Sequence, residues 1–240
     1  MVAGSNPAGR TFSSKQRMNN ESFVLNSEEK YKSHELINSK FWPWIDLNFD
    51  KPGYIITMPS RSGRQENMIL EYILKSEHHR SKASKLRLLT FDDTYEASGT
   101  GIRLEEHPHR LWTHQRCGDI FNRLIDRGYS ETPVAVWFDL TGGLLNQRIL
   151  ALRSIISNMF AHGSLMFITL GIDNVRGLSN EHYIRAVYDY SGVSKAEATN
   201  ATLIRLGEVS NKYMVPCCAP YVYKHGKTTY GVFGYLIGKH

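Results

Sequence analysis

The sequence contains only three cysteines among its 240 residues, and Cys117, Cys217 and Cys218 match no metal-ligand spacing. Cys217 and Cys218 are neighbours, so a disulfide between them would close a strained ring. A small secreted scaffold held together by disulfides is therefore excluded, and we expect a reducing compartment. We also expect one main domain, because this length can bury a full core.

Long apolar runs are absent as well. No segment approaches the roughly 18 consecutive apolar residues that a membrane span needs, and the N-terminus lacks the apolar core of a secretory signal. Residues 1–20 contain no acid and few large apolar side chains, which predicts a disordered tail. An acid-free start that contains Arg and Ser also fits a mitochondrial transit peptide, but we favour the tail. The expected protein is soluble and intracellular, cytoplasmic rather than mitochondrial, with no membrane partner.

Several catalytic signatures are missing from the loop that contains Ser60, Arg61, Ser62 and Gly63. The P-loop spacing and its Lys are absent, so a P-loop ATPase is not predicted. The glycine that precedes a nucleophilic serine in G-x-S-x-G is absent too. The simplest interpretation is a polar turn in which Ser60 or Ser62 caps the next helix. Glu66 could support that helix start or contact a ligand amine.

Positive charge exceeds negative charge, with 29 Lys and Arg against 23 Asp and Glu, a net charge of +6 and a pI near 9.2. This balance permits a nucleic-acid partner without requiring one. Five histidines lie among the basic residues of the segment 61–116, but nothing in their spacing directs them to one point, so no metal site is predicted. The segment is either an ordinary solvated face or an edge that follows a phosphate backbone. The candidate nucleic-acid contacts are Arg61, Arg64, Arg80, Lys82, Arg110 and Arg116.

Apolar strands alternate with helical patterns through most of the chain. The strands are predicted to be apolar throughout, which is typical of parallel strands covered on both faces. Two aromatic and β-branched runs around KHGK then predict a C-terminal hairpin. The expected fold is a doubly wound, mostly parallel α/β sheet with helices on both faces, finished by this antiparallel hairpin. The predicted strands are 54–58, 85–93, 134–138 and 164–171, and the predicted helices are 67–76, 109–128, 144–163, 179–190 and 194–212.

The segment before the first strand is expected to be a helical extension. Its pattern is helical from about residue 21 to 45, and Pro43 in the cluster FWPW is expected to stop the helix. We interpret the cluster as a lid packed on the edge of the core rather than as a stacking platform for bases. The predicted organisation is a tail at 1–20, a helical extension at 21–50 and an α/β domain at 51–240.

The strand at 134–138 ends on Asp139 and is followed by LTGG, and the strand at 85–93 also ends on acids. With the closing hairpin, this order resembles the class I S-adenosylmethionine-dependent methyltransferases over about residues 50–240. The resemblance implies that the loop after the first strand, an acid after the second and an acid after the fourth hold S-adenosylmethionine and the methyl acceptor. All of these groups fall at the carboxyl ends of strands. It implies Asp139 as the catalytic residue and, as cofactor-binding residues, Pro59, Ser60, Ser62, Gly63, Asp92, Asp93 and Gly142.

The first loop departs from the family pattern, because it has one glycine, Gly63, and two arginines, Arg61 and Arg64. Guanidinium groups beside a helix N-terminus suit phosphate or carboxylate better than a sulfonium cation. Two functions therefore stay open. The first is transfer of a methyl group from S-adenosylmethionine to a nucleic acid or an associated acceptor. The second is a catalytically inactive protein of the same fold that binds nucleic acid or serves as an assembly component.

Overall fold

The computed structural model describes residues 28–48, 53–58, 64–75, 86–92, 112–116, 132–140, 143–144, 146–172 and 194–239. Within these ranges the backbone alone is described at residues 64, 91, 92, 112–116, 146, 147 and 239.

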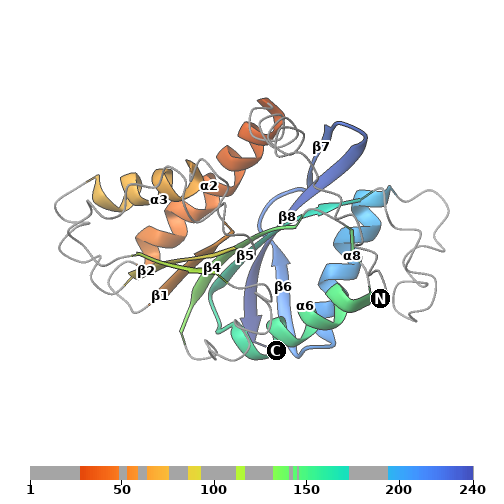
Figure 1. Ribbon diagram of the computed structural model, residues 1–240. Helices are drawn as coiled ribbons and strands as arrows, with labels where there is room; N and C mark the ends of the chain where they lie inside the picture. The colour runs from red at the N-terminus through yellow and green to blue at the C-terminus, as the bar shows by residue number, and fades with distance from the viewer. Residues whose placement is uncertain are drawn as a thin grey trace, which may run out of the picture.

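The described chain forms an eight-stranded mixed sheet (Figure 1). Five strands lie side by side and parallel in the order β3, β2, β1, β4 and β5. Strand β8 runs antiparallel to β5, and both β6 and β7 pair antiparallel with the outer edge of β8. The strand bounds are β1 Gly53–Thr57, β2 Leu86–Asp92, β3 Trp112–Arg116, β4 Val134–Asp139, β5 Ser164–Gly171, β6 Lys212–Pro216, β7 Tyr221–His225 and β8 Thr228–Lys239.

Helices cover both faces of this sheet (Figure 1). Helices α2 (Glu28–Asn48) and α3 (Arg64–Leu74) pack on one face, and α6 (Asn146–Met159) and α8 (Lys195–Glu208) pack on the other. Successive apolar residues of β4 and β5 lie alternately in the two apolar cores, one on each face of the sheet. The doubly wound, mostly parallel fold predicted from the sequence is therefore confirmed.

Burial on both sides explains why β4 and β5 are apolar along nearly their whole length. All eight residues of β5 are buried, as are the first five of β4. Local signals set the ends of the neighbouring helices. Gly163, with φ of +84°, makes the turn between α6 and β5, and a capping box between Ser194 and Glu197 starts α8. The predicted hairpin is also present, with Gly226 at φ +59° in the turn between β7 and β8.

The FWPW cluster packs as a lid on the core, as predicted. Phe41 and Trp44 are buried against the sheet, and the Trp44 indole N–H donates a hydrogen bond of 2.8 Å to the Gly163 carbonyl. The expectation that Pro43 stops this helix was wrong, because α2 continues through Pro43 to Asn48. Proline removes one hydrogen bond within a helix, but buried side chains on both sides of Pro43 hold the next turn against the sheet.

Two further predictions fail in part. The segment 109–128 was predicted to be a helix, but Trp112–Arg116 is the strand β3, paired in parallel with β2. Strand β6 lies in a segment for which no strand was predicted. Both are short edge strands, and their state is decided by the neighbour that supplies hydrogen bonds rather than by their own periodicity. The predicted helix at 179–190 lies outside the described residues.

None of the helices in the described part of the chain combines the length and apolar character that a membrane crossing requires.

Candidate functional site at the carboxyl edge of the sheet

The carboxyl ends of β2, β1 and β4 lie next to one another. Thr57 at the end of β1 pairs with Thr90 of β2 on one side and with Trp137 of β4 on the other, in parallel register. Asp139 ends β4 two residues later, and Asp92 ends β2. Since open α/β sheets bind ligands outside the carboxyl ends of their strands, this edge is the candidate site.

Asp139 forms an ion pair with the first turn of α2. Lys30 Nζ lies 3.0 Å from Asp139 Oδ2, and the two side chains are 16% and 21% exposed. The Tyr221 hydroxyl donates a weak hydrogen bond of 3.4 Å to the Glu29 carbonyl, so the start of α2 also contacts β7. The amino end of α2 therefore crosses over the end of β4 and brings a cation to its carboxylate.

A second carboxyl group is buried close enough to Asp139 for the charge of Asp139 to act on it. Glu66, in the first turn of α3, is fully buried. Among the buried side chains that the structure describes, only Glu66 and Thr57 have polar atoms without an aligned hydrogen-bond partner. Burial raises the pKa of Glu66 and the charge of Asp139 raises it further, although the Thr57 hydroxyl beside it acts in the opposite direction. A buried acid of this kind is costly unless a partner offsets the loss of hydration.

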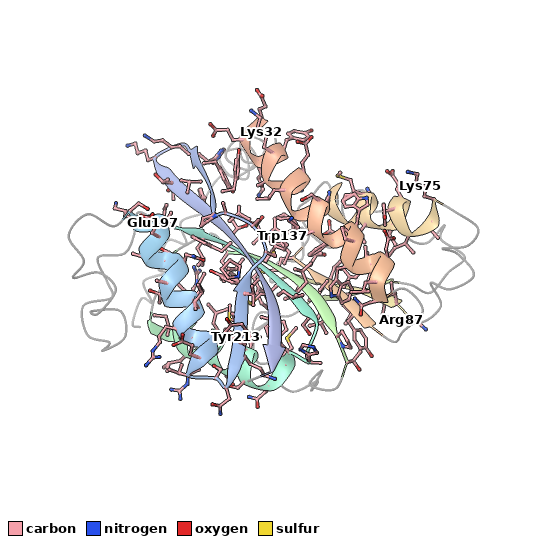
Figure 2. The ribbon with its side chains drawn as sticks, turned by 180° about the vertical axis from the view of Figure 1, so that it is seen from behind. Lys32, Lys75, Arg87, Trp137, Glu197 and Tyr213 are labelled. Carbon is pink, nitrogen blue, oxygen red and sulfur yellow. The ribbon has the colours of Figure 1, made fainter. Side chains whose placement is uncertain are left out.

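A chain of polar side chains connects α2 to the start of α3. His34 Nδ1 lies 3.0 Å from Gln65 Oε1, and the Gln65 amide donates a hydrogen bond to the Asn38 side-chain oxygen. The His34 ring meets the Trp137 indole edge-on at a centroid distance of 4.9 Å, and Figure 2 shows Trp137 on the sheet beside α2. Burial lowers the pKa of His34, and the nearby Lys30 ammonium lowers it further. The neutral ring therefore fits its place between helix and sheet.

Lys30, His34 and Asn38 were not predicted from the sequence as site residues. Their spacing of four residues places them on one face of a helix, above Phe41 and Ile45 on the same side. A polar stripe that continues an apolar stripe is a signal that could have found them. Their partners in α3 and β4 could not be identified in this way, because those contacts span 27 to 109 residues of sequence.

Of the residues selected from the sequence for the site, Asp139 is fully described. Asp92 ends β2 with its backbone opposite Arg116 of β3, and Arg64 begins α3, but the side chains of these three lie outside the described part. The other selected residues also lie outside it: Pro59, Ser60, Arg61, Ser62, Gly63, Arg80, Lys82, Asp93, Arg110 and Gly142. The structure thus brings Asp139 together with Lys30 and Glu66, and the roles assigned to the others stay predictions.

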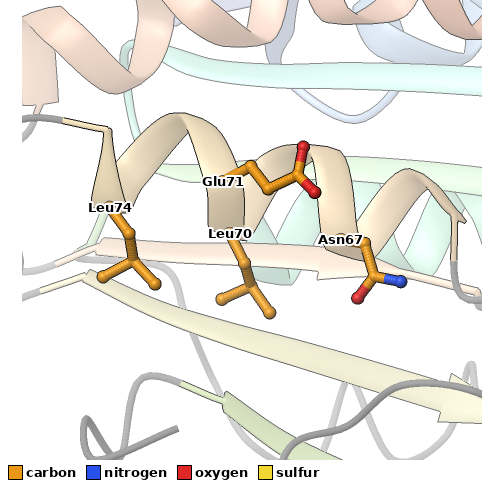
Figure 3. Close-up of a pocket in the computed structure, with 4 residues that line it drawn as sticks. All are labelled: Asn67, Leu70, Glu71 and Leu74. Carbon is orange, nitrogen blue, oxygen red and sulfur yellow. The ribbon is translucent and has the colours of Figure 1, made fainter.

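A separate hollow of about 360 Å³ runs along α3 and is lined by Asn67, Leu70, Glu71 and Leu74 (Figure 3). Figure 3 shows Asn67, Leu70 and Leu74 on the side of the helix toward β1 and β2. Its described lining has one carboxylate and no base. Within the described residues, no group of three or more His, Cys, Asp or Glu side chains is placed to hold a metal ion.

Five parallel strands are followed in the sheet by the antiparallel strand β8, which lies between β5 and β6. This strand order can be compared with that of solved structures. The DszA carbon methyltransferase matches 88% of this chain with a TM-score of 0.53 and 13% identity. Trm1 from Pyrococcus horikoshii, solved with S-adenosyl-L-methionine, matches 86% with a TM-score of 0.51 and 10% identity. The chain has a class I methyltransferase-like fold.

This methyltransferase-like chain spans little more than half the length of those two proteins, 55% of DszA and 56% of Trm1. No family model and no curated protein matches it. Glu66 and Asp139 lie at the carboxyl edge of β1 and β4. This is the edge at which a ligand is expected from the sequence.

Proposed function

We propose that this methyltransferase-like domain binds S-adenosylmethionine at the carboxyl edge of β1, β2 and β4 and transfers its methyl group to a nucleic acid or an associated acceptor. The observation that carries the proposal is the buried Glu66 carboxyl, which has no aligned hydrogen-bond partner among the described residues and lies beside Asp139. Lys30 pairs with Asp139, and no cation among the described residues is paired with Glu66, so a second positive group fits this edge.

The donor set is compatible with the chemistry of the cofactor, which carries a sulfonium and an ammonium cation. When bound, S-adenosylmethionine supplies an electrophilic methyl group. Glu66 supplies a negative charge to one cation of the ligand, and ionisation of this buried acid becomes favourable as that cation approaches. Asp139 orients the acceptor or takes its proton once Lys30 releases it. We assign the remaining contacts to Pro59, Ser60, Ser62, Gly63, Asp92, Asp93 and Gly142.

Calorimetry and thermal shift with S-adenosylmethionine test the binding step. A ligand at 100 times its dissociation constant stabilises a protein by about 2.7 kcal/mol, which is a measurable shift in Tm. We expect Glu66→Gln to weaken binding, and Glu71→Gln, at an exposed acid on the same helix, to leave it unchanged. Equal binding by wild type and Glu66→Gln would contradict the assigned role of Glu66.

The ion pair gives a second, opposite test. Lys30→Met leaves Asp139 without its neighbouring ammonium and makes the edge more negative. S-adenosylmethionine should then bind more tightly than to the wild type. S-adenosylhomocysteine, which has a neutral sulfur, should gain less. A loss of affinity for both ligands would mean that Lys30 holds the ligand rather than competing with its charge.

For the acceptor, we propose a nucleic acid because the chain carries a net charge of +6. The logarithm of the affinity for RNA or DNA should fall linearly with the logarithm of the salt concentration. The slope is set by the number of phosphates that the protein contacts. The contacts that we assign are Arg61, Arg64, Arg80, Lys82, Arg110 and Arg116. Replacing one of them by Gln should reduce the slope by about 1. Binding that is independent of salt would remove this partner.

A catalytically inactive protein of the same fold is the second candidate, and one contact favours it. Lys30 already neutralises Asp139, the acid proposed to act on the acceptor. This candidate predicts no thermal shift with S-adenosylmethionine in the wild type or in Lys30→Met. Salt-dependent binding of nucleic acid would persist, which separates the two functions.

A further inference from the structure

The outer edge of β8 has a gap between its two partners. Strand β6 pairs with β8 from Tyr235 onward, and β7 pairs with it only up to Val232. Phe233 and Gly234 therefore lie between the two pairings on that edge. The chain that connects β6 to β7 bends at Cys217 and Cys218, directly beside this gap.

Backbone contacts with Gly234 hold both cysteines at the gap. The Cys217 N–H donates a hydrogen bond of 3.0 Å to the Gly234 carbonyl, and the backbone of Gly234 also lowers the pKa of the Cys218 thiol. A Cβ atom on Gly234 would lie 2.9 Å from the Cys217 sulfur, closer than a carbon and a sulfur can approach. The absence of a side chain at Gly234 thus provides the space that the Cys217 thiol occupies.

The two thiol groups lie on the same side of the chain. Both side chains pack against the same apolar cluster, although neighbouring residues of a straight strand point to opposite faces, and each thiol shifts the pKa of the other. Both are free, and both residues are only partly buried. They pack at the margin of the core under α2, where Lys40 contributes a nearby positive charge. Adjacent, accessible thiols on the same side of the chain need little rearrangement to bind one atom together.

We propose that Cys217 and Cys218 form a bidentate dithiol site for a soft, thiophilic centre such as trivalent arsenic. With an arsenoxide, two S–As bonds form, the two thiol protons leave with the arsenoxide oxygen as one water, and no atom changes oxidation state. A bridging atom also enlarges the ring between neighbouring cysteines, which a direct disulfide would strain. The site is separate from the carboxyl edge and does not depend on methyl transfer.

Phenylarsine oxide and the full chain provide the test. Intact mass should show one phenylarsenic group added with loss of one water. A dithiol such as dimercaptopropanol should remove the group, whereas an excess of a monothiol should not. Cys217→Ser and Cys218→Ser should each retain the reagent about a hundredfold less well, because the second bond is intramolecular only when both thiols are present. Cys117→Ser should behave as the wild type.

Thermal unfolding of each variant checks that it folds. In folded Cys217→Ser or Cys218→Ser, an adduct as stable as that of the wild type overturns the proposal. So does an adduct that requires Cys117, or the absence of any adduct with the folded wild type.

Discussion

Glu66→Gln should stabilise this protein, although Glu66 is placed in the binding site. The wild-type carboxyl is fully buried, and both its oxygens are without an aligned hydrogen-bond partner among the described residues. A buried polar group left unsatisfied costs about 1–3 kcal/mol, and more when it is charged. Glutamine has nearly the same shape and no charge to desolvate. We therefore expect a gain of about 1–3 kcal/mol in the free energy of unfolding at pH 8.

The gain should depend on pH with a definite sign. Burial raises the pKa of Glu66 in the folded protein above its value in the unfolded chain. At a pH below the range in which an ordinary carboxyl group titrates, Glu66 is protonated in both the folded and the unfolded wild type. A protonated Glu resembles Gln. As the pH rises, the unfolded chain loses the proton first and unfolding becomes easier, by about 1.4 kcal/mol for each unit of pKa difference. The advantage of Glu66→Gln should therefore be small near pH 4 and larger at pH 8.

Urea denaturation of the wild type and Glu66→Gln from pH 4 to pH 8 measures this difference. Glu71→Gln, which removes an exposed acid from the same helix, is the matched control and should show no comparable trend. If Glu66→Gln is less stable than the wild type at pH 8, or if its advantage does not change with pH, then Glu66 is not an unpaired buried acid. The proposed cation site at this edge would then lose its support.

Three further predictions concern the scaffold and are measured by thermal or urea unfolding. Gly234→Ala should cost at least about 1–3 kcal/mol, because its Cβ would lie 2.5 Å from a ring carbon of Phe167; an unchanged Tm would contradict this packing. Trp44→Phe should cost about 1–3 kcal/mol through the lost hydrogen bond to Gly163 and the smaller ring; a neutral result would show that this bond contributes little. Ser194→Ala should cost about 1 kcal/mol by removing the cap of α8, whereas Ser194→Gly should cost less.

The fold could be predicted from the sequence because its central elements carry strong local signals. The run at 164–171 has no position for a solvent-facing side chain, and the strand occupies those same residues. Glycine at 163 and at 226 marks two turns at which the backbone adopts positive φ. The edge strands β3 and β6 have weaker patterns of their own and were missed, because their hydrogen bonds come from neighbours distant in sequence.

The candidate site could be predicted only in part. Asp139 was selected because an acid that ends an apolar strand lies at the sheet edge, and the structure places it there. Its pairing with Lys30 could not be predicted, since 109 residues separate the two. Glu66 was noted only as a helix support or an amine contact. That it is fully buried depends on how α2 and α3 pack together over the sheet.

The sequence by itself determined the class of fold and the strand end on which Asp139 lies, because apolar periodicity and glycine positions act over a few residues. Only the tertiary structure decided the charge balance around Asp139. It brings the ammonium of Lys30 to this carboxylate and the buried carboxyl of Glu66 within range of its charge, and it brings Cys217 and Cys218 to the gap in β8. The physical reason is that electrostatic energy depends on separation in space and on loss of hydration, which the packing of distant segments sets.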